Sequence, residues 1–397
     1  MAGANGGRPD VGGAGQTGHA GDGAAGEEPG TAGESGGQGA AGGAAGEPSG
    51  ASGGDAAGSA GSAGSGGLGG LGGGAGTAGS GGISPEGGSA GEFAEEDPGD
   101  PPEPLALSGS LGVHDPAVMF VDGTYYLFYT GPGITTKRST DLTTWQETNV
   151  VFASNPAWIA TQIPRATDLW APDISYFGGQ YHLYYSASSF GSNRSCIGHA
   201  TQATIDGDAW VDRGPLICSN VTATYDDWNA IDPNVVLDGA GTPWLAFGSF
   251  WGGIKLIRLD HSGARADAEL HAIAARTDSP AVEAPFIVRR GPYYYLFVSF
   301  DSCCRGLNST YNLRVGRSTF VHGPYVDADG VSLLIGGGTR VLSGNEDFRG
   351  PGHNAVLVRG DDAFNVYHAY GAPSGAPILR ISELVWNAEG WPLSAGP

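Results

Sequence analysis

The folded part of this chain repeats one supersecondary unit five times, and this repeat restricts the possible fold more than any other feature. Each unit contains a strand of alternating aromatic and aliphatic residues that follows a turn containing Gly or Asp. The five strands are YYLFYTG from Tyr125, YHLYYSAS from Tyr181, PWLAFGSF from Pro243, YYYLFVSF from Tyr293 and FNVYHAYG from Phe364. Period-two strands at such intervals predict an all-β fold built of repeated units.

A short apolar run led by a polar residue precedes each of these strands. The leading residues are Asp115, Asp173, Asp232, Glu283 and His353, in the segments DPAVMFV, PDISYF, DPNVVL, EAPFIV and HNAVLV. Successive leading residues are 58, 59, 51 and 70 positions apart. Five such units, each of about four antiparallel strands, describe a five-bladed β-propeller. We expect it to occupy residues 105–397 as the single folded domain.

Residues 1–104 differ from the propeller region in composition. Residues 1–90 contain 37 glycines and neither an aromatic residue nor a cysteine. Such a segment has too little apolar surface to offset the entropy lost when its backbone is ordered. We therefore expect residues 1–104 to form a disordered, low-complexity tether.

Charge and cysteine content restrict the partners and the compartment. Of 41 acidic and 19 basic residues, the tether holds 14 acids and one arginine, which leaves 27 acids and 18 bases in the propeller. This excess of acid disfavours nucleic acid as a partner and suits a neutral substrate. The sequence contains no apolar run of membrane-spanning length and no segment with the layout of a signal peptide. We expect the protein to be a monomer. The four cysteines favour disulfides, with buried free thiols as the alternative.

The polar residues that lead the five units are expected to meet in one pocket. In a propeller the innermost strand of every blade lines the central channel, and these strands start at the same rim. Four carboxyl groups and a histidine gathered in this way do not stabilise a fold, because unpaired buried charges cost free energy. They suit either the binding of a hard cation or acid–base cleavage of a glycosidic bond.

Blade position assigns roles to the three acids expected to carry the chemistry. Asp115 and Glu283 fall in the first and fourth blades, which are not neighbours, so a water molecule has room between them. A separation of roughly 6.5–9.5 Å between a base and an acid leads to inversion of configuration. We expect Asp115 to be the base and Glu283 the acid, with Asp232 in the third blade raising the pKa of Glu283 and orienting it.

Other residues are candidates for binding. Asp173 adjoins Asp115 around the ring and is expected to have a supporting role, whereas His353 suits a cation ligand or a hydrogen bond to substrate. Sugars stack on flat apolar rings, and core packing is the alternative role for any aromatic residue. The aromatic candidates are Trp170, Phe190, Phe250 and Trp251.

The order of the motifs resembles glycoside hydrolase family 43, and within it the endo-1,5-α-L-arabinanases. The similar blocks, spread over residues 108–397, are HDPAVMFVDGTYYLFYTG, LWAPDISYFGGQYHLYYSAS, NAIDPNVVLD, GSFWGGI, VEAPFIVRRGPYYYLFVSF with CCRGLNSTY, and GPGHNAVL. The resemblance implies an inverting enzyme with Asp115, Glu283 and Asp232 in the roles given above. It also implies that His114 and Asn229, which lie in two of these blocks, contact substrate.

The same resemblance has further implications for ligands and location. It implies a calcium ion near the propeller axis, held largely through water and by His353. It also matches the adjacent Cys303 and Cys304, which can form a vicinal disulfide. The expected substrate is the plant cell-wall polysaccharide arabinan. The expected location is outside the cell, free or attached to the envelope by the tether.

Two alternative functions fit part of the pattern. An exo-acting α-L-arabinofuranosidase or β-xylosidase of the same fold would differ in the shape of its pocket, which the sequence does not define. A carbohydrate-binding propeller without catalysis would have no use for three acids in one channel. The sequence therefore favours an endo-acting hydrolase.

Overall fold

A computed structural model describes residues 99–397, except residues 208 and 223–224. The tether predicted for residues 1–104 thus lies almost wholly outside the described residues. The described part is all-β apart from one short helix, α1 (Ala157–Gln162), and the 3₁₀ turns Gly306–Asn308 and Leu333–Ile335. No helix in this part is long and apolar enough to cross a membrane.

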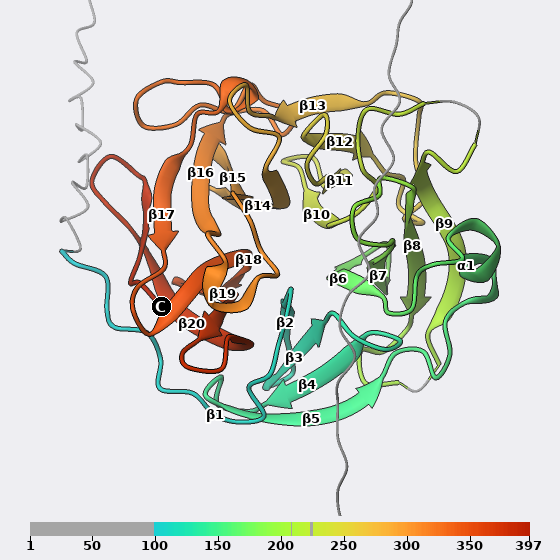
Figure 1. The fold of residues 1–397 in the computed structure, drawn as a ribbon, viewed down its shortest axis with the longest axis horizontal. Helices are drawn as coiled ribbons and strands as arrows, with labels where there is room; N and C mark the ends of the chain where they lie inside the picture. Colours follow the sequence, from blue (N-terminus) through green and yellow to red (C-terminus); the bar gives the residue numbers. More distant parts are fainter. Residues whose placement is uncertain (1–98, 208, 223–224) are drawn as a thin grey trace, which may run out of the picture. The chain divides into compact units, whose positions relative to one another are not determined.

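Five sheets, antiparallel except where β1 joins the first of them, surround a common axis, as Figure 1 shows, which confirms the predicted five-bladed propeller. In each blade the strands run from the axis outward in chain order. Blade 1 contains β2 (Ala117–Val121), β3 (Thr124–Tyr129), β4 (Thr135–Ser139) and β5 (Thr144–Val150), with β1 (Ser108–Gly109) at its outer edge. Blade 2 contains β6 (Trp170–Phe177), β7 (Gln180–Ala187), β8 (Ser195–Gln202) and β9 (Val211–Ser219).

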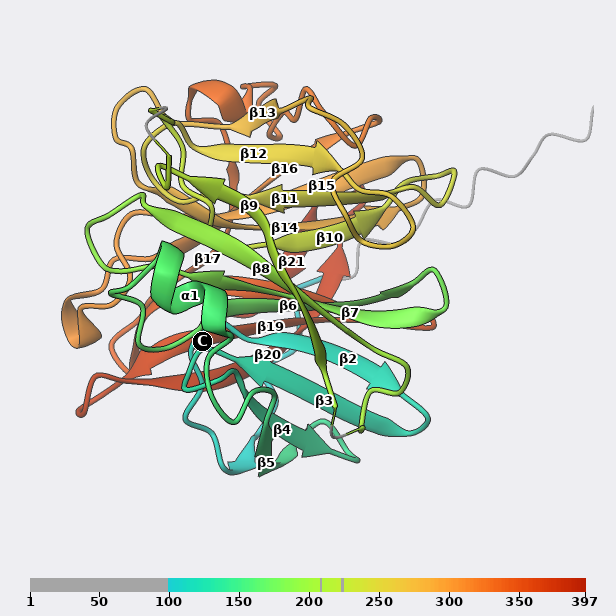
Figure 2. The same ribbon diagram turned by 90° about the vertical axis from the view of Figure 1, so that its right-hand side faces the viewer.

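The other three blades repeat this order. Blade 3 contains β10 (Asn234–Leu237), β11 (Pro243–Phe247), β12 (Ile254–Arg258) and β13 (His271–Ala274). Blade 4 contains β14 (Val282–Arg290), β15 (Tyr293–Phe300), β16 (Asn312–Ser318) and β17 (Thr339–Ser343). Blade 5 contains β18 (Phe348–Arg359), β19 (Asp362–Gly371), β20 (Ala376–Trp386) and β21 (Pro392–Ser394). Figure 2 shows the blades from the side.

The second strand of each blade is apolar on both faces because both faces are covered by neighbouring blades. In β15, Leu296 and Val298 pack in a cluster with blade 3, whereas Phe297 packs on the opposite face in a cluster with blade 5. All three side chains are fully buried. A strand covered on both faces reads as a continuous apolar run. This packing explains the aromatic segments from which the repeat was identified.

The segment before blade 1 joins the first blade to the last. The backbone N–H of Leu105 donates to the carbonyl of Ile381 in β20, and the N–H of Leu379 donates to the carbonyl of Leu111. A few residues away, β1 pairs in parallel with β5 of blade 1. The chain therefore closes the ring of blades through its own amino-terminal segment.

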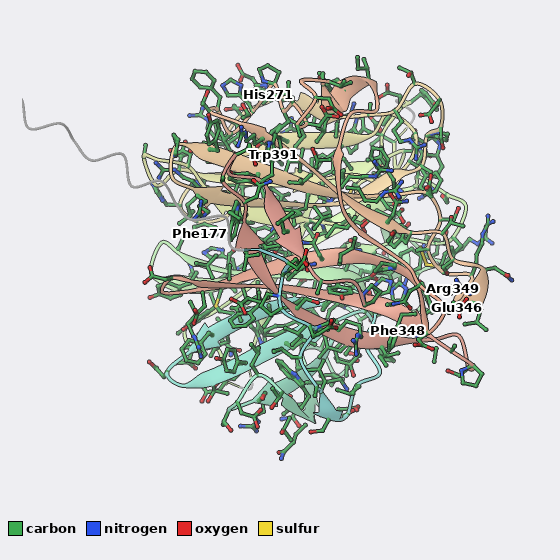
Figure 3. All side chains as sticks on the ribbon, turned by 90° about the vertical axis from the view of Figure 1, so that its left-hand side faces the viewer. Phe177, His271, Glu346, Phe348, Arg349 and Trp391 are labelled. Atoms are coloured by element: carbon green, nitrogen blue, oxygen red, sulfur yellow. A yellow bond between two sulfur atoms is a disulfide. The ribbon has the colours of Figure 1, made fainter. Side chains whose placement is uncertain are left out.

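The inner strands all run in one direction, so they begin at one rim of the propeller. Figure 3 shows Phe177, at the end of β6, and Arg349, near the start of β18, on opposite sides of the molecule. All four cysteines are in disulfides, Cys196 with Cys218 and Cys303 with Cys304. The first disulfide links the paired strands β8 and β9.

Candidate active site

One residue just before or in the first half of every inner strand has a left-handed backbone. These residues are Asp115, Ala171, Asp232, Ala284 and His353, with φ between 44° and 59°. In blades 2, 4 and 5 the pairing of the first two strands shifts register at this residue, as in a β-bulge, a feature that redirects side chains near active sites. A left-handed non-glycine residue costs about 1–3 kcal/mol, so its surroundings must impose it. We call these five residues the rim residues.

The rim residue of blade 2 is Ala171, so the predicted position of Asp173 was wrong by two residues. Asp173 aligns instead with Asn234 of blade 3, and its carboxylate accepts hydrogen bonds from Asn234 Nδ2 at 3.1 Å and from the backbone N–H of Val235 at 2.9 Å. Burial raises the pKa of Asp173 to about 7 despite these two bonds. Asp173 therefore ties blade 2 to blade 3, and these contacts account for its burial without a substrate.

Asp115, the predicted base, is surrounded by cationic and hydrogen-bonding groups. Its Oδ2 lies 2.8 Å from His114 Nδ1 and accepts a hydrogen bond from Thr130 Oγ1 at 2.6 Å, while its Oδ1 lies 3.1 Å from His353 Nδ1. Burial alone would raise the pKa of Asp115, but the charges and hydrogen bonds of His114 and His353 outweigh burial and hold it well below its usual value. Asp115 is therefore a carboxylate at neutral pH, as a base must be.

Glu283, the predicted acid, is held by two neutral hydroxyl groups. Ser249 Oγ donates to Oε2 at 2.6 Å, and the hydroxyl of Tyr311 donates to Oε1. Burial raises the pKa of Glu283, the two hydroxyls and His353 lower it, and Asp115 raises it further; the net shift is upward. Sequence reasoning found neither Ser249 nor Tyr311, because both lie outside the inner strands.

Asp232 lies beside Glu283, as predicted, and is connected to it through the backbone. Its Oδ2 accepts a hydrogen bond from the N–H of Ala284 at 3.1 Å. Burial raises the pKa of Asp232 to about 8; His353 opposes this shift, and the charges of Glu283 and Asp115 add to it. The two carboxyls therefore hold a proton between them near neutral pH. Burial raises these two pKa values more than does the charge repulsion on which the sequence prediction relied.

His353 lies among the three acids, on the side of Asp115. Burial would lower its pKa, but the charge of Asp115, the hydrogen bond to it, and the charges of Asp232 and Glu283 raise it to about 9. The three acids therefore favour a positive charge at this place, which the protonated ring of His353 supplies near neutral pH. Nδ1 of His353 is engaged by Asp115, which leaves Nε2 as its single ligand atom. A metal ion at this atom would have to displace its proton and would take its other ligands mainly from water.

His114 has protein partners at both ring nitrogens. Nδ1 pairs with Asp115, and Nε2 lies 2.8 Å from the hydroxyl of Tyr370. The Tyr370 oxygen also accepts a hydrogen bond from the backbone N–H of Cys304 at 2.7 Å. Tyr370 therefore has its own proton available for Nε2 of His114. The vicinal disulfide thus adjoins a chain of hydrogen bonds that ends at the base.

The predicted sugar-binding aromatic residues come from blades 2 and 3. Trp170 immediately precedes Ala171, and its ring lies 5.2 Å from that of the exposed Phe190. Phe250 and Trp251 follow Ser249, the partner of Glu283, and Trp251 is exposed. None of these four rings belongs to a buried cluster. This placement near the predicted catalytic residues favours stacking on substrate over core packing.

Asn229, three residues before Asp232, was also predicted to contact substrate. Its side chain is 2% exposed, and its Oδ1 has no hydrogen-bond partner among the described residues. A buried polar atom without a partner costs about 1–3 kcal/mol, which a bound ligand or water can offset. The unpaired oxygen agrees with a role in binding.

Comparison with known proteins gives one family and many relatives. A family model described as glycosyl hydrolases family 43 matches residues 109–392. Among curated proteins, an extracellular endo-α-(1→5)-L-arabinanase from Bacillus subtilis is 44% identical over 287 residues, covering 70% of this chain and 87% of that protein. An extracellular exo-α-(1→5)-L-arabinofuranosidase from Cellvibrio japonicus is 42% identical over 301 residues, covering 71% and 86%.

Solved structures give a matching result. An endo-arabinanase from Bacillus licheniformis is 44% identical, with a TM-score of 0.69, and the match covers 73% of this chain and 99% of that one. A Cellvibrio cellulosa α-L-arabinanase complexed with arabinohexaose is 40% identical, with a TM-score of 0.69 and coverage of 72% and 96%. In both cases the match takes in nearly the whole of the solved chain.

Proposed function

The chain belongs to glycosyl hydrolase family 43, and from this premise we propose that it hydrolyses internal α-1,5-L-arabinofuranosidic bonds of arabinan with inversion of configuration. One observation supports this more than any other. Two buried carboxyl groups that interact electrostatically have pKa values shifted in opposite directions, downward for Asp115 and upward for Glu283. Such a pair provides a base and an acid at the same pH.

The reaction then follows from the environment of each residue. Asp115 takes a proton from a water molecule, and the water oxygen attacks the anomeric carbon of the arabinosyl unit. Glu283 donates its proton to the departing glycosidic oxygen. Asp232 shares the proton of this pair, because both carboxyls cannot ionise together in a buried site. The positive ring of His353 and the ring of His114 keep Asp115 ionised.

Endo action is the favoured mode. Named endo-arabinanases and arabinan endo-1,5-α-L-arabinosidases are the more numerous among the relatives, although an exo-acting relative has nearly the same identity. Exo cleavage of the same bond is therefore the second candidate. Digestion of debranched arabinan distinguishes them, because endo action releases oligosaccharides first and exo action releases one small product throughout.

We infer a calcium ion at His353 as a supporting group. To hold the ion together with water, His353 Nε2 would have to give up its proton, and the ion would then supply the positive charge next to Asp115 that the protonated ring supplies without it. Metal analysis of protein purified without added calcium, followed by a thermal melt with and without a chelator, tests this inference. A stoichiometric ion whose removal lowers Tm supports it. Protein without metal whose Tm ignores both calcium and chelator contradicts it.

We also infer that the protein acts outside the cell. The two relatives with the identities given above are named extracellular. Both pairs of cysteines are oxidised, which is typical of proteins from oxidising compartments. Fractionation of the source cells with an antibody against the propeller tests this. Detection in the cytosolic fraction alone contradicts it.

The experiment that tests the enzymatic proposal compares debranched arabinan with xylan. Release of arabino-oligosaccharides from arabinan, abolished in the Glu283→Gln variant while binding to arabinan is retained, is the expected result. Binding without any cleavage by the unaltered protein would instead mean a carbohydrate-binding propeller without catalysis.

A further inference from the structure

The rim residues are connected to one another by backbone hydrogen bonds that cross from blade to blade. The N–H of each rim residue donates to a side chain of the preceding blade, and blade 5 precedes blade 1. The acceptors are Thr130 for Ala171 at 2.8 Å, Ser186 for Asp232 at 3.0 Å, Asp232 for Ala284 at 3.1 Å, Ser299 for His353 at 2.9 Å and His368 for Asp115 at 3.2 Å. The five bonds form a closed circle around the channel.

Four of the five acceptors occupy the same place in their blades. Each lies on the second strand or immediately after it, opposite the residue that precedes the rim residue of its own blade. The pairs are His114 with Thr130, Trp170 with Ser186, Glu283 with Ser299, and Gly352 with His368. Ser186, Ser299 and His368 are fully buried. Contact with bulk water therefore does not explain why these three buried positions have polar side chains.

Blade 3 differs from the other four blades at this position. Gly248 lies there, opposite Ile231, and it has no side chain that could accept a hydrogen bond. Its φ of 135° and the close approach of the Gly253 carbonyl, 2.5 Å from where a Cβ would lie, exclude a larger residue. The carboxylate of Asp232 takes the place of the missing acceptor and binds the N–H of Ala284.

We propose that Thr130, Ser186, Ser299 and His368 are positioning residues that set the spacing of the catalytic groups through this circle of hydrogen bonds. Their bonds hold the backbone of Ala171, Asp232, His353 and Asp115, respectively, and the bond to Asp232 holds Ala284, the residue next to Glu283. Each left-handed rim residue is strained, so the loss of its bond releases that backbone toward an ordinary conformation. A displacement of the order of 1 Å at a catalytic group lowers the rate by about 100-fold.

This proposal rests on the proposed hydrolase activity, and its test compares variants that keep every catalytic side chain. Ser186→Ala and Ser299→Ala each remove one bond of the circle. Ser382→Ala is the matched control, because Ser382 is a fully buried serine of blade 5 whose hydroxyl bonds Tyr367 and the carbonyl of Ala395, away from the rim residues. Kinetics on debranched arabinan and thermal melts are measured for all of them.

We expect kcat to fall at least about tenfold in Ser186→Ala and Ser299→Ala, with KM changed less than about twofold. Ser382→Ala is expected to lower Tm by a similar amount with kcat within about twofold of the unaltered protein. Removal of one hydrogen bond already relaxes part of the backbone strain that the circle maintains. The double variant Ser186→Ala/Ser299→Ala is therefore expected to lose less kcat than the product of the two single fold-losses.

The hydroxyl of Thr130 also donates to Asp115, so its removal would not separate the circle from the base. A second test therefore uses Ser186→Thr and Ser186→Val, which add the same bulk and differ only in the hydroxyl. We expect Ser186→Thr to retain at least about tenfold more kcat than Ser186→Val. Three results overturn the proposal: equal kcat losses in Ser382→Ala and Ser186→Ala, a rise in KM at constant kcat, or equal kcat of Ser186→Thr and Ser186→Val when both melt as folded proteins. Absence of cleavage by the unaltered protein overturns the proposed function itself.

Discussion

Asp115 and Glu283 are alike in burial and opposite in protonation. Their exposed fractions are 8% and 7%, and burial is the largest upward influence on the pKa of each. The imidazole rings of His114 and His353 face Asp115, and their electrostatic attraction and hydrogen bonds outweigh burial. Neutral hydroxyls face Glu283 and do not outweigh it. The contrast shows that the charge of the hydrogen-bonding partners, and not burial, separates the base from the acid.

The largest expected effect comes from removal of either carboxyl group. Asp115→Ala and Glu283→Ala should each lower kcat on debranched arabinan by about 10³-fold or more, since general acid or base catalysis contributes 10²–10⁴-fold. An arabino-oligosaccharide with a dinitrophenyl leaving group needs no proton from Glu283. Rates on this substrate should recover in Glu283→Ala and stay low in Asp115→Ala. Recovery in Asp115→Ala instead would exchange the two assigned roles.

A second prediction concerns the hydroxyl of Tyr311 at Glu283. Tyr311→Phe removes a donor that stabilises the ionised acid, so the pKa of Glu283 should rise and the alkaline limb of the pH–activity profile should move upward. We expect kcat to fall about tenfold as the acid loses its orientation. Tyr325→Phe is the control, because Tyr325 is equally buried and bonds only the carbonyl of Val321. A downward move of the alkaline limb in Tyr311→Phe contradicts the account.

A third prediction concerns His114, which was predicted from the sequence to bind substrate. Asp115 and Tyr370 engage both ring nitrogens of His114, so we expect His114 to act on the base and to influence kcat more than KM. Tyr370→Phe should therefore lower kcat by about three- to tenfold with little change in KM. A raised KM at constant kcat would return His114 to the role of a substrate contact.

The smallest effect on activity is expected at Asp173. Its pKa is about 7 in the folded protein and near 4 when unfolded, so the folded state binds the extra proton between these values. The free energy of unfolding should therefore fall as pH rises from 4 to 7. Denaturant melts of Asp173→Asn should lack this fall, with a difference of about 2–4 kcal/mol between the two proteins across that range. Parallel pH curves for the two proteins would show that Asp173 stays ionised.

The sequence predicted the propeller because this fold depends on a repeat along the chain. The same repeat brought Asp115, Glu283 and Asp232 together as candidates, although Ala284 and not Glu283 is the rim residue of blade 4. The error at Asp173 arose from aligning blades by their acids. Proline follows the rim residue in four blades, and alignment on Pro116, Pro172, Pro233 and Pro285 would have identified Ala171. Ser249, Tyr311 and the hydrogen-bonded circle were not predictable in this way, because their partners lie in other strands or blades.

The contrast between Asp115 and Glu283 is tested most directly by the stereochemistry of the first product. Proton NMR of debranched arabinan, recorded within the first minutes of digestion, distinguishes the anomers of the new reducing end before they equilibrate. The account predicts the β anomer, formed when water held by Asp115 attacks opposite the bond that Glu283 protonates. Initial formation of the α anomer would mean retention, with a carboxylate acting as nucleophile, and would contradict the division of roles between the two acids.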